Sequence, residues 1–464
     1  MSRLRRSLSL LREALLGSSR DFTTGPIGEA VFLLAVPMVA EMAMESLFAL
    51  ADVYFVSRLG STAVASVGLT ESMLVLLYAC AIGLGMGTTA MVARRTGEGD
   101  PEGASAAAGQ AIWIGLGLSL VVAVPGFLLG GKALELMGMS AQEAAEGGSY
   151  PRVMFATSAT IVFLFLLNAV FRGAGDATHA MRALWLANGL NIVLDPCLIF
   201  GLGPFPEMGL TGAAVATAIG RGTGVAYQLW ILLSGRSRVR LDRRLLRFQP
   251  ELARRLLSVS LGGIYQFLVA TGSWLALVRI LSAFGSSVVA GYTIAIRVIV
   301  FSILPAWGMA NAAATLMGQN LGAGKPDRAE ASVWRTGWYN TGFLMFVAVL
   351  FWVFAGPIVG NFTTDPEVTR WAISCLRWIT YGYFIYGFGM VIVQAFNGAG
   401  DTTTPTKINL VGYWAFQIPV AWLLARHTPL GPTGVFVAIL ATEVLIAIAG
   451  ILIFRRGSWR TRVI

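Results

Sequence analysis

Charged residues are scarce in this sequence. Asp, Glu, Lys and Arg together make up 12% of its 464 residues, whereas 56% of the residues are hydrophobic. Globular domains carry roughly a quarter charged residues, and no long polar stretch separates the apolar runs. The composition therefore excludes a protein that is soluble throughout, and it indicates a polytopic membrane protein.

Cysteine and histidine are also rare. The three cysteines, Cys80, Cys197 and Cys375, lie in apolar runs, which predicts buried free thiols rather than a disulfide framework or a metal cluster. His179 and His427 lie near loops and offer neither a metal site nor a catalytic triad. A Walker-type glycine loop is absent. We therefore expect a protein that is not an enzyme, is not driven by ATP and has no cofactor.

Long apolar runs dominate what is present. Gly, Pro and charged residues divide the chain into twelve segments, each long enough to meet the need of a spanning helix for about 20 apolar residues. We therefore predict an all-α polytopic membrane protein with twelve transmembrane helices. The segments are 30–56, 63–92, 106–130, 148–171, 180–203, 210–234, 255–282, 288–318, 331–356, 369–396, 406–426 and 433–454.

Positive charge gathers in alternate loops of this twelve-segment count. Arginines precede the first segment, follow the second and the fourth, fill the loop from Arg236 to Arg255, and close the chain. The positive-inside rule assigns that side to the cytosol. We therefore expect a multi-pass protein of the inner or plasma membrane with both termini cytosolic. The net charge of +10 is then an orientation signal, and we expect lipid but no nucleic acid as a partner.

The two halves of the sequence repeat each other. A shift of 225 residues carries TGEGDPEGA (96–104) onto LGAGKPDRA (321–329), and FRGAGDAT (171–178) onto FNGAGDTT (396–403). Because six segments separate the copies, the halves form two pseudo-symmetric six-helix bundles that run the same way through the membrane. The expected parts are a cytosolic amino-terminal segment at 1–27, an N-lobe at 28–234, a basic cytosolic linker at 235–254, a C-lobe at 255–455 and a cytosolic tail at 456–464.

Acidic residues interrupt the first apolar segment. Pro37, Glu41, Glu45 and Asp52 follow one another at spacings of four, four and seven residues, which places them along one stripe of a helix. Pro37 removes a backbone hydrogen bond and predicts a hinge. Glu41 and Glu45 lie closer to the cytosolic mouth, where they would either pair structurally or attract cations.

Polar residues in the fifth segment share a face with each other. Asn188, Asn191 and Asp195 are spaced by three and four residues, and Pro196 provides a second hinge because it frees the carbonyl of Ile192.

A cluster in the outer half of the membrane follows from helix depth, at about 1.5 Å per residue. Its expected members are Asp52, Tyr150, Asn191, Asp195 and Thr217. Two carboxylates in a low dielectric cannot both ionise cheaply, so such a pair would carry a proton. With the amide and hydroxyl oxygens, Asp52, Asn191, Asp195 and Thr217 would equally suit Na⁺.

Other intramembrane charges are related by the repeat. Arg297 lies next to the repeat partner of Glu71, and Arg221 corresponds to Glu443. In one interpretation these charges form ion pairs between the lobes that control a gate, with Glu71 and Arg297 as the gating pair. In the other they form structural pairs within one lobe.

These motifs together resemble the multidrug and toxic compound extrusion (MATE) family over nearly the full chain. The resemblance is carried by MGQNLGAGKPDRA (317–329), by FRGAGD and FNGAGD, by ALADVYFVSRLG (49–60) and by NIVLDP (191–196), and it is closest to the DinF-like branch. It implies a monomeric secondary antiporter that exports small organic cations in exchange for protons or sodium by alternating access.

The resemblance also implies site residues. It assigns the coupling site to Asp52, Asn191 and Asp195, makes Pro37 the bending point, and adds Tyr150, Asn168 and Thr217 to the network. The NorM-like branch instead uses acidic residues of the seventh and tenth spans, which contain none here, so we expect no sodium site in the C-lobe. The alternatives are a lipid-linked flippase of the same superfamily and a membrane-embedded enzyme.

Overall fold

The computed structural model describes residues 3–242, 244, 247–462 and 464. Residues 1 and 2 of the expected amino-terminal segment, 243, 245 and 246 of the expected linker and 463 of the expected tail lie outside this description. Regular structure in the described part is helical throughout. The elements are α1 (Arg3–Leu16), α2 (Ile27–Ser57), α3 (Ser61–Gly97), α4 (Pro101–Leu136), α5 (Ala141–Gly147), α6 (Ser149–Ala156), α7 (Ser158–Ala174), α8 (Ala177–Phe200), α9 (Leu210–Leu233), α10 (Pro250–Ser282), α11 (Ser286–Gly322), α12 (Pro326–Gly360), α13 (Pro366–Tyr381), α14 (Tyr383–Gly398), α15 (Thr403–Asn409), the π-helix η1 (Leu410–Gln417), α16 (Ile418–His427), α17 (Pro432–Arg455) and the 3-10 helix η2 (Ser458–Thr461).

The twelve predicted spans are all present as helices. In the described part, nine helices are long and apolar enough to cross a membrane, and two bent pairs, α6–α7 and α13–α14, each add one span. Helix α9 completes the set. It is less apolar because it carries glycines and Arg221. The packing between α8 and α9 is nevertheless the most extensive between any two of the described helices. The predicted all-α fold of twelve transmembrane helices in two bundles is confirmed.

The helices extend beyond the predicted segments at most ends. Helix α4 runs over Pro101–Leu136, whereas its apolar core predicted 106–130. Its first turn begins at a proline, and the Asp100 side chain caps it by accepting the backbone N–H of Gly103 at 2.8 Å. Hydropathy detects the part of a helix that is apolar, whereas the backbone continues to its cap. For the same reason α10 begins at Pro250, within the expected linker.

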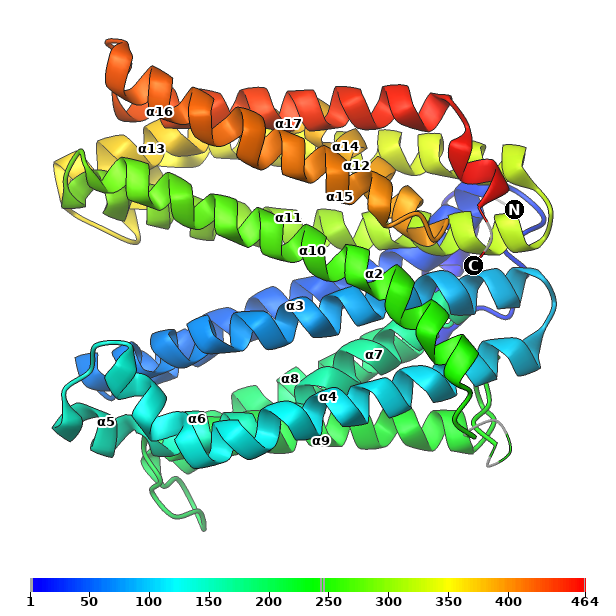
Figure 1. The fold of residues 1–464 in the computed structure, drawn as a ribbon, viewed down its shortest axis with the longest axis horizontal. Coiled ribbons are helices and arrows are strands. Elements are labelled where there is room, and N and C mark those ends of the chain that lie inside the picture. The colour runs from blue at the N-terminus through cyan, green and yellow to red at the C-terminus, as the bar shows by residue number, and fades with distance from the viewer. Residues whose placement is uncertain (1–2, 243, 245–246, 463) are drawn as a thin grey trace.

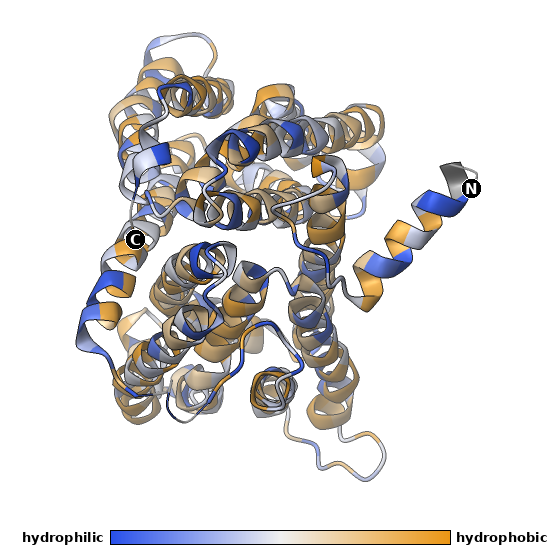
Figure 2. Ribbon diagram, turned by 90° about the vertical axis from the view of Figure 1, so that its right-hand side faces the viewer, coloured by the Kyte–Doolittle hydropathy of each residue, from blue (hydrophilic) through white to orange (hydrophobic). Residues whose placement is uncertain are grey.

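Two lobes are visible in Figure 1, the N-lobe of α2–α9 below and the C-lobe of α10–α17 above. Both termini lie at one end of the molecule, which we call the terminal side, and the lobes diverge toward the opposite end. Seen from the terminal side, the helices of the two lobes are mostly hydrophobic in colour, whereas the helix that leads from the N-terminus, α1, alternates polar and apolar residues (Figure 2). The packing between the lobes runs mainly through α2 with α11 and α3 with α10.

Glycines bring the two lobes into close contact on the terminal side. A methyl group at Gly97 of α3 would lie 2.0 Å from the carbonyl oxygen of Gln319 in α11. One at Gly322 of α11 would lie 2.1 Å from the carbonyl oxygen of Arg94 in α3. Only glycine permits such an approach of two backbones. The terminal side is therefore closed in this structure.

The segment between α1 and α2, residues 17–26, joins the two lobes a second time, and we call it the strap. Arg328 of the C-lobe donates to the backbone carbonyls of Phe22, Thr24 and Gly25. Lys325 donates to the carbonyl of Thr23 at 2.9 Å. The closed end is therefore held by these hydrogen bonds as well as by the glycine contacts.

The strap is also bound to the N-lobe side. Arg238, in the segment after α9, donates to the carbonyl of Arg20 at 2.7 Å. The Asp21 carboxylate accepts the backbone N–H of Thr23 at 2.8 Å. Partial burial raises the pKa of Asp21, but the hydrogen bonds from Thr23 and the charges of Lys325 and Arg238 outweigh this effect and hold that pKa below its ordinary value.

Candidate functional site

Helices α8 and α9 place three of the predicted site residues in direct contact. The Asn191 Nδ2 atom donates to Thr217 Oγ1 at 3.1 Å and to Asp195 Oδ1 at 3.4 Å. Asp195 is fully buried, and neither its Oδ2 atom nor the Oδ1 atom of Asn191 has a hydrogen-bond partner among the described residues. Buried polar atoms are nearly always paired. These two oxygens are therefore free to take up a proton or to bind a cation.

Helix α2 supplies the second carboxylate of this cluster. Asp52 is 8% exposed, and Asp52 and Asp195 are close enough for the charge of one to act on the other. Tyr150 of α6 is buried within electrostatic range of Asp52. The structure thus brings Asp52, Tyr150, Asn191, Asp195 and Thr217 into one region of the N-lobe.

A buried arginine completes the cluster, and the sequence analysis did not place it there. Arg221 of α9 lies within electrostatic range of Asp52 and Glu71, and its Nη2 atom donates to the Tyr78 hydroxyl at 3.3 Å. Its Nη1 atom is buried without a partner. The signal in the sequence was the spacing of Thr217 and Arg221, since residues four apart share a helix face.

Glu71 also lies within electrostatic range of Arg297 of the C-lobe. Within the described residues no ion pair joins the two side chains. Their role as gating charges stays a prediction.

A second polar cluster lies closer to the terminal side. The Glu41 Oε1 atom accepts from Arg172 at 2.8 Å and from Asn168 Nδ2 at 3.0 Å. Gln228 donates to the Oδ1 atom of Asn168 at 2.5 Å. Asn168, which the resemblance assigned to the coupling network, therefore binds Glu41. Glu45 accepts from Asn188 at 2.9 Å.

The two predicted hinges lie within continuous helices. Helix α2 runs unbroken through Pro37, and α8 through Pro196. Proline removes the donor that would bind the carbonyl four residues earlier, which for Pro37 is Leu33. Next to this weak point, a methyl group at Gly308 of α11 would lie 2.5 Å from the carbonyl oxygen of Met38. The C-lobe therefore packs directly against the expected bending point.

Comparison with known proteins identifies the family. The MatE family model matches residues 37–197 and, a second time, residues 264–423. The chain belongs to the multidrug and toxic compound extrusion (MATE) family. The two matches cover corresponding parts of the two lobes.

This MATE protein is similar to named relatives along almost all of its length. It is 27% identical to the probable multidrug resistance protein NorM of Thermotoga maritima, with 94% of each chain covered. It is 24% identical to the multidrug export protein MepA of Staphylococcus aureus, covering 93% of this chain and 94% of the relative. A solved structure described as the outward-facing conformation of a multidrug resistance MATE family transporter matches with a TM-score of 0.88 and 29% identity, covering 94% of this chain and 97% of that one.

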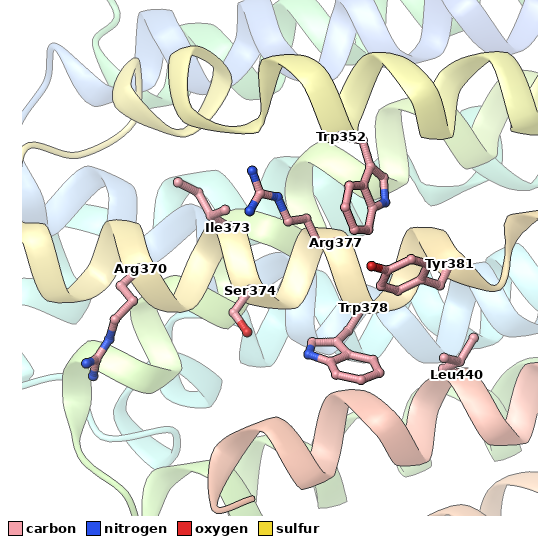
Figure 3. A pocket seen from close by; sticks show the side chains of 8 residues that line it. All are labelled: Trp352, Arg370, Ile373, Ser374, Arg377, Trp378, Tyr381 and Leu440. Atoms are coloured by element: carbon pink, nitrogen blue, oxygen red, sulfur yellow. The ribbon is translucent and has the colours of Figure 1, made fainter.

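The predicted site does not coincide with the hollow on the outer flank of this MATE protein. That hollow has a volume of about 790 Å³ and is lined by side chains of α12, α13 and α17, among them Trp352, Arg370, Arg377, Trp378 and Tyr381 (Figure 3). Aromatic and basic residues of this kind are typical of the membrane interface. None of the predicted coupling residues lines it.

Proposed function

We propose that this MATE protein exports small organic cations across the cell membrane in exchange for protons, by alternating access between its two lobes. The observation that carries the proposal is the fully buried Asp195, whose Oδ2 atom has no partner and which lies within electrostatic range of Asp52. A proton on one of the two carboxyl groups removes the repulsion between them and supplies the missing donor. The names of the multidrug relatives support the class of substrate.

The competing coupling ion is Na⁺. The carboxylate, amide and hydroxyl oxygens of Asp52, Asn191, Asp195 and Thr217 are ligands that suit this ion. In the part of the chain that the structure describes, no three His, Cys, Asp or Glu side chains form a metal site, so the ion would depend on Asn191 and Thr217 as ligands. We favour the proton because Arg221 already supplies one fixed positive charge near Asp52.

In the proposed cycle the structure represents the state open away from the termini. The close packing of Gly97 and Gly322 on the terminal side and the likeness to an outward-facing transporter support this assignment. The basic residues on the terminal side support a cytosolic location of both termini. We place the protein in the inner or plasma membrane as a monomer.

Protonation of the N-lobe from the outside then neutralises Asp52 and Asp195, lets α2 bend at Pro37 and releases the cation outward. One proton contributes about 2.3 kcal/mol per 100 mV of membrane potential and roughly 1.4 kcal/mol per pH unit. In a one-for-one exchange with a monovalent cation the two electrical contributions cancel, so each pH unit supports a cation gradient of about tenfold. A second proton per cation adds both contributions.

Transport by the purified protein in proteoliposomes tests the proposal. Uptake of a fluorescent organic cation is driven separately by a proton gradient and by a sodium gradient. We expect proton-driven transport, its loss in Asp52→Asn and Asp195→Asn, and a wild-type rate in the control Asp327→Asn, whose side chain is 88% exposed. Transport at the wild-type rate in both site variants would refute the coupling site, and transport driven only by sodium would refute the proton.

A further inference from the structure

A single carboxylate lies inside the C-lobe between two adjoining cavities. Their volumes are about 210 Å³ and 180 Å³, and both are lined by Ala270, Ile303, Tyr386, Tyr413 and Glu443. Because these five residues face both spaces, the cavities meet at Glu443. Either space is large enough for a small organic molecule.

Glu443 forms no ion pair with any of the described residues. Its Oε1 atom accepts from the Tyr413 hydroxyl at 3.3 Å, and Glu443 is the only charged group among the described residues that line the two cavities. A buried carboxylate without a counter-charge is unfavourable. Either a proton on Glu443 or a positively charged ligand beside it removes this cost.

Aromatic rings and thioethers surround this carboxylate. The larger cavity is lined by Phe267, Trp307 and Met390, and the smaller one by Trp274 and Tyr292. Ring faces and polarizable sulfur attract cations and pack against flat apolar groups. Such walls favour an organic cation over a hydrated inorganic one.

Four amide side chains at or next to the larger cavity are occupied by one another. Gln394 donates to Asn311 at 2.7 Å, Asn397 donates to Gln394 at 2.8 Å, and Gln266 donates to Asn397 at 2.9 Å. Glu443 is therefore the group left to bind a charged ligand. Met86, which also lines the larger cavity, belongs to α3 of the N-lobe, so the cavity reaches the surface along which the lobes separate.

The repeat gives the two lobes opposite charges at this position. The shift of 222 residues that carries MGLTGAAVA (208–216) onto LGPTGVFVA (430–438) also carries Arg221 onto Glu443. The N-lobe thus has a fixed cation where the C-lobe has an unpaired anion. A positively charged ligand is repelled by the first and attracted by the second.

We propose that Glu443 is the counter-charge of a C-lobe binding site for a monovalent, flat organic cation. The inference rests on the proposed export function and identifies where the exported cation binds. The N-lobe carboxylates then hold the coupling ion, and the aromatic cavity of the C-lobe holds the cation. The two sites lie in different lobes, so cargo and coupling ion need not compete for one carboxylate.

Binding to the purified full-length protein in detergent tests the site. Equilibrium dialysis measures the Kd of N-methylquinolinium, a permanent flat cation, and of quinoline, its neutral analogue at pH 7. We expect Glu443→Gln to weaken binding of the cation by at least about tenfold, as for the loss of a charged partner, with little effect on quinoline. The control Glu102→Gln changes an exposed glutamate at the start of α4, and it should bind both compounds as the wild type does.

A second variant tests the cavity itself. Ala270→Trp fills the junction of the two spaces while Glu443 is retained, and we expect it to abolish binding of both compounds. An unchanged Kd for the cation in either Glu443→Gln or Ala270→Trp overturns the inference, whereas the export function stands if proteoliposomes still transport. Conversely, wild-type protein that binds the cation through Glu443 but never transports it overturns the export function and leaves the site intact.

Discussion

A methyl group added at Gly97 is expected to open the terminal side. In the structure this methyl group would lie 2.0 Å from the carbonyl oxygen, 2.7 Å from the carbonyl carbon and 2.8 Å from the Cα atom of Gln319. All three are backbone atoms of α11, so no rotamer change relieves the clash, and the lobes must move apart. Gly97→Ala therefore destabilises the conformation in which α3 and α11 touch, and only that one.

The magnitude follows from the cost of overpacking. Inserting a methyl group into a well-packed interface costs about 1–3 kcal/mol, which corresponds to a shift of about 5- to 150-fold in a conformational equilibrium. Replacing glycine by alanine within a helix also gains about 1 kcal/mol, but this gain applies equally to the open and closed states. The matched control is Gly68→Ala in the same helix, where the added methyl group meets nothing within 4 Å.

Distances between spin labels measure the outcome. Labels are attached to cysteines introduced at the exposed positions Glu102 of α4 and Ala331 of α12, in a chain whose three native cysteines are replaced. Double electron–electron resonance should show one short distance on the terminal side for the wild type and for Gly68→Ala. A longer distance should dominate in Gly97→Ala. If Gly97→Ala and Gly68→Ala give the same distribution, the contact at Gly97 does not hold the lobes closed.

Three further changes test other contacts. Arg172→Met leaves Glu41, which is 1% exposed, buried without its cation. It should lower the free energy of unfolding by about 3–5 kcal/mol, seen as a lower melting temperature in detergent, and an added Glu41→Gln should restore part of the loss. Arg328→Ala removes the hydrogen bonds to three strap carbonyls and should speed proteolysis between residues 17 and 26; cleavage at the wild-type rate would contradict this. The lowered pKa of Asp21 stabilises the strap at pH values above the ordinary pKa of aspartate, and this stabilisation is lost as the pH falls through the lowered value. Acid should therefore increase strap proteolysis in the wild type, and an equal increase in Asp21→Asn would show that another group is responsible.

The spans were predictable because apolar length and loop charge are local properties of the sequence. The breaks within the spans were not predictable from the sequence. Helix α13 meets α14 at an angle of 62° next to Gly382, and a π-helix occupies Leu410–Gln417. Both lie inside continuous apolar runs, and glycines within α3 and α9 leave those helices unbroken. Whether a helix bends at such a point depends on the helices packed around it, which a single sequence does not reveal.

The candidate site also has a part that was predictable from the sequence and a part that was not. Helix periodicity and depth brought Asn191, Asp195 and Thr217 together correctly, because these residues share faces of two helices that are neighbours in the chain. Depth also explains why Asn168 binds Glu41, since both lie toward the terminal side. The position of Glu443 in an aromatic cavity was not predictable, because that cavity is built by helices far apart in sequence.

Toward the C-lobe, Arg328 and Lys325 hold the strap through its main chain. Arg328 and Lys325 bind the carbonyl oxygens of residues 22–25, and every amino acid carries such an oxygen. Substitutions at an exposed strap residue such as Thr24 therefore leave these contacts in place, whereas substitution of Arg328 or Lys325 removes them. Across relatives that keep this closure, we expect the exposed strap positions to vary in sequence while the length and path of the strap are kept, and we expect the constraint to fall on Lys325 and Arg328 at the start of α12.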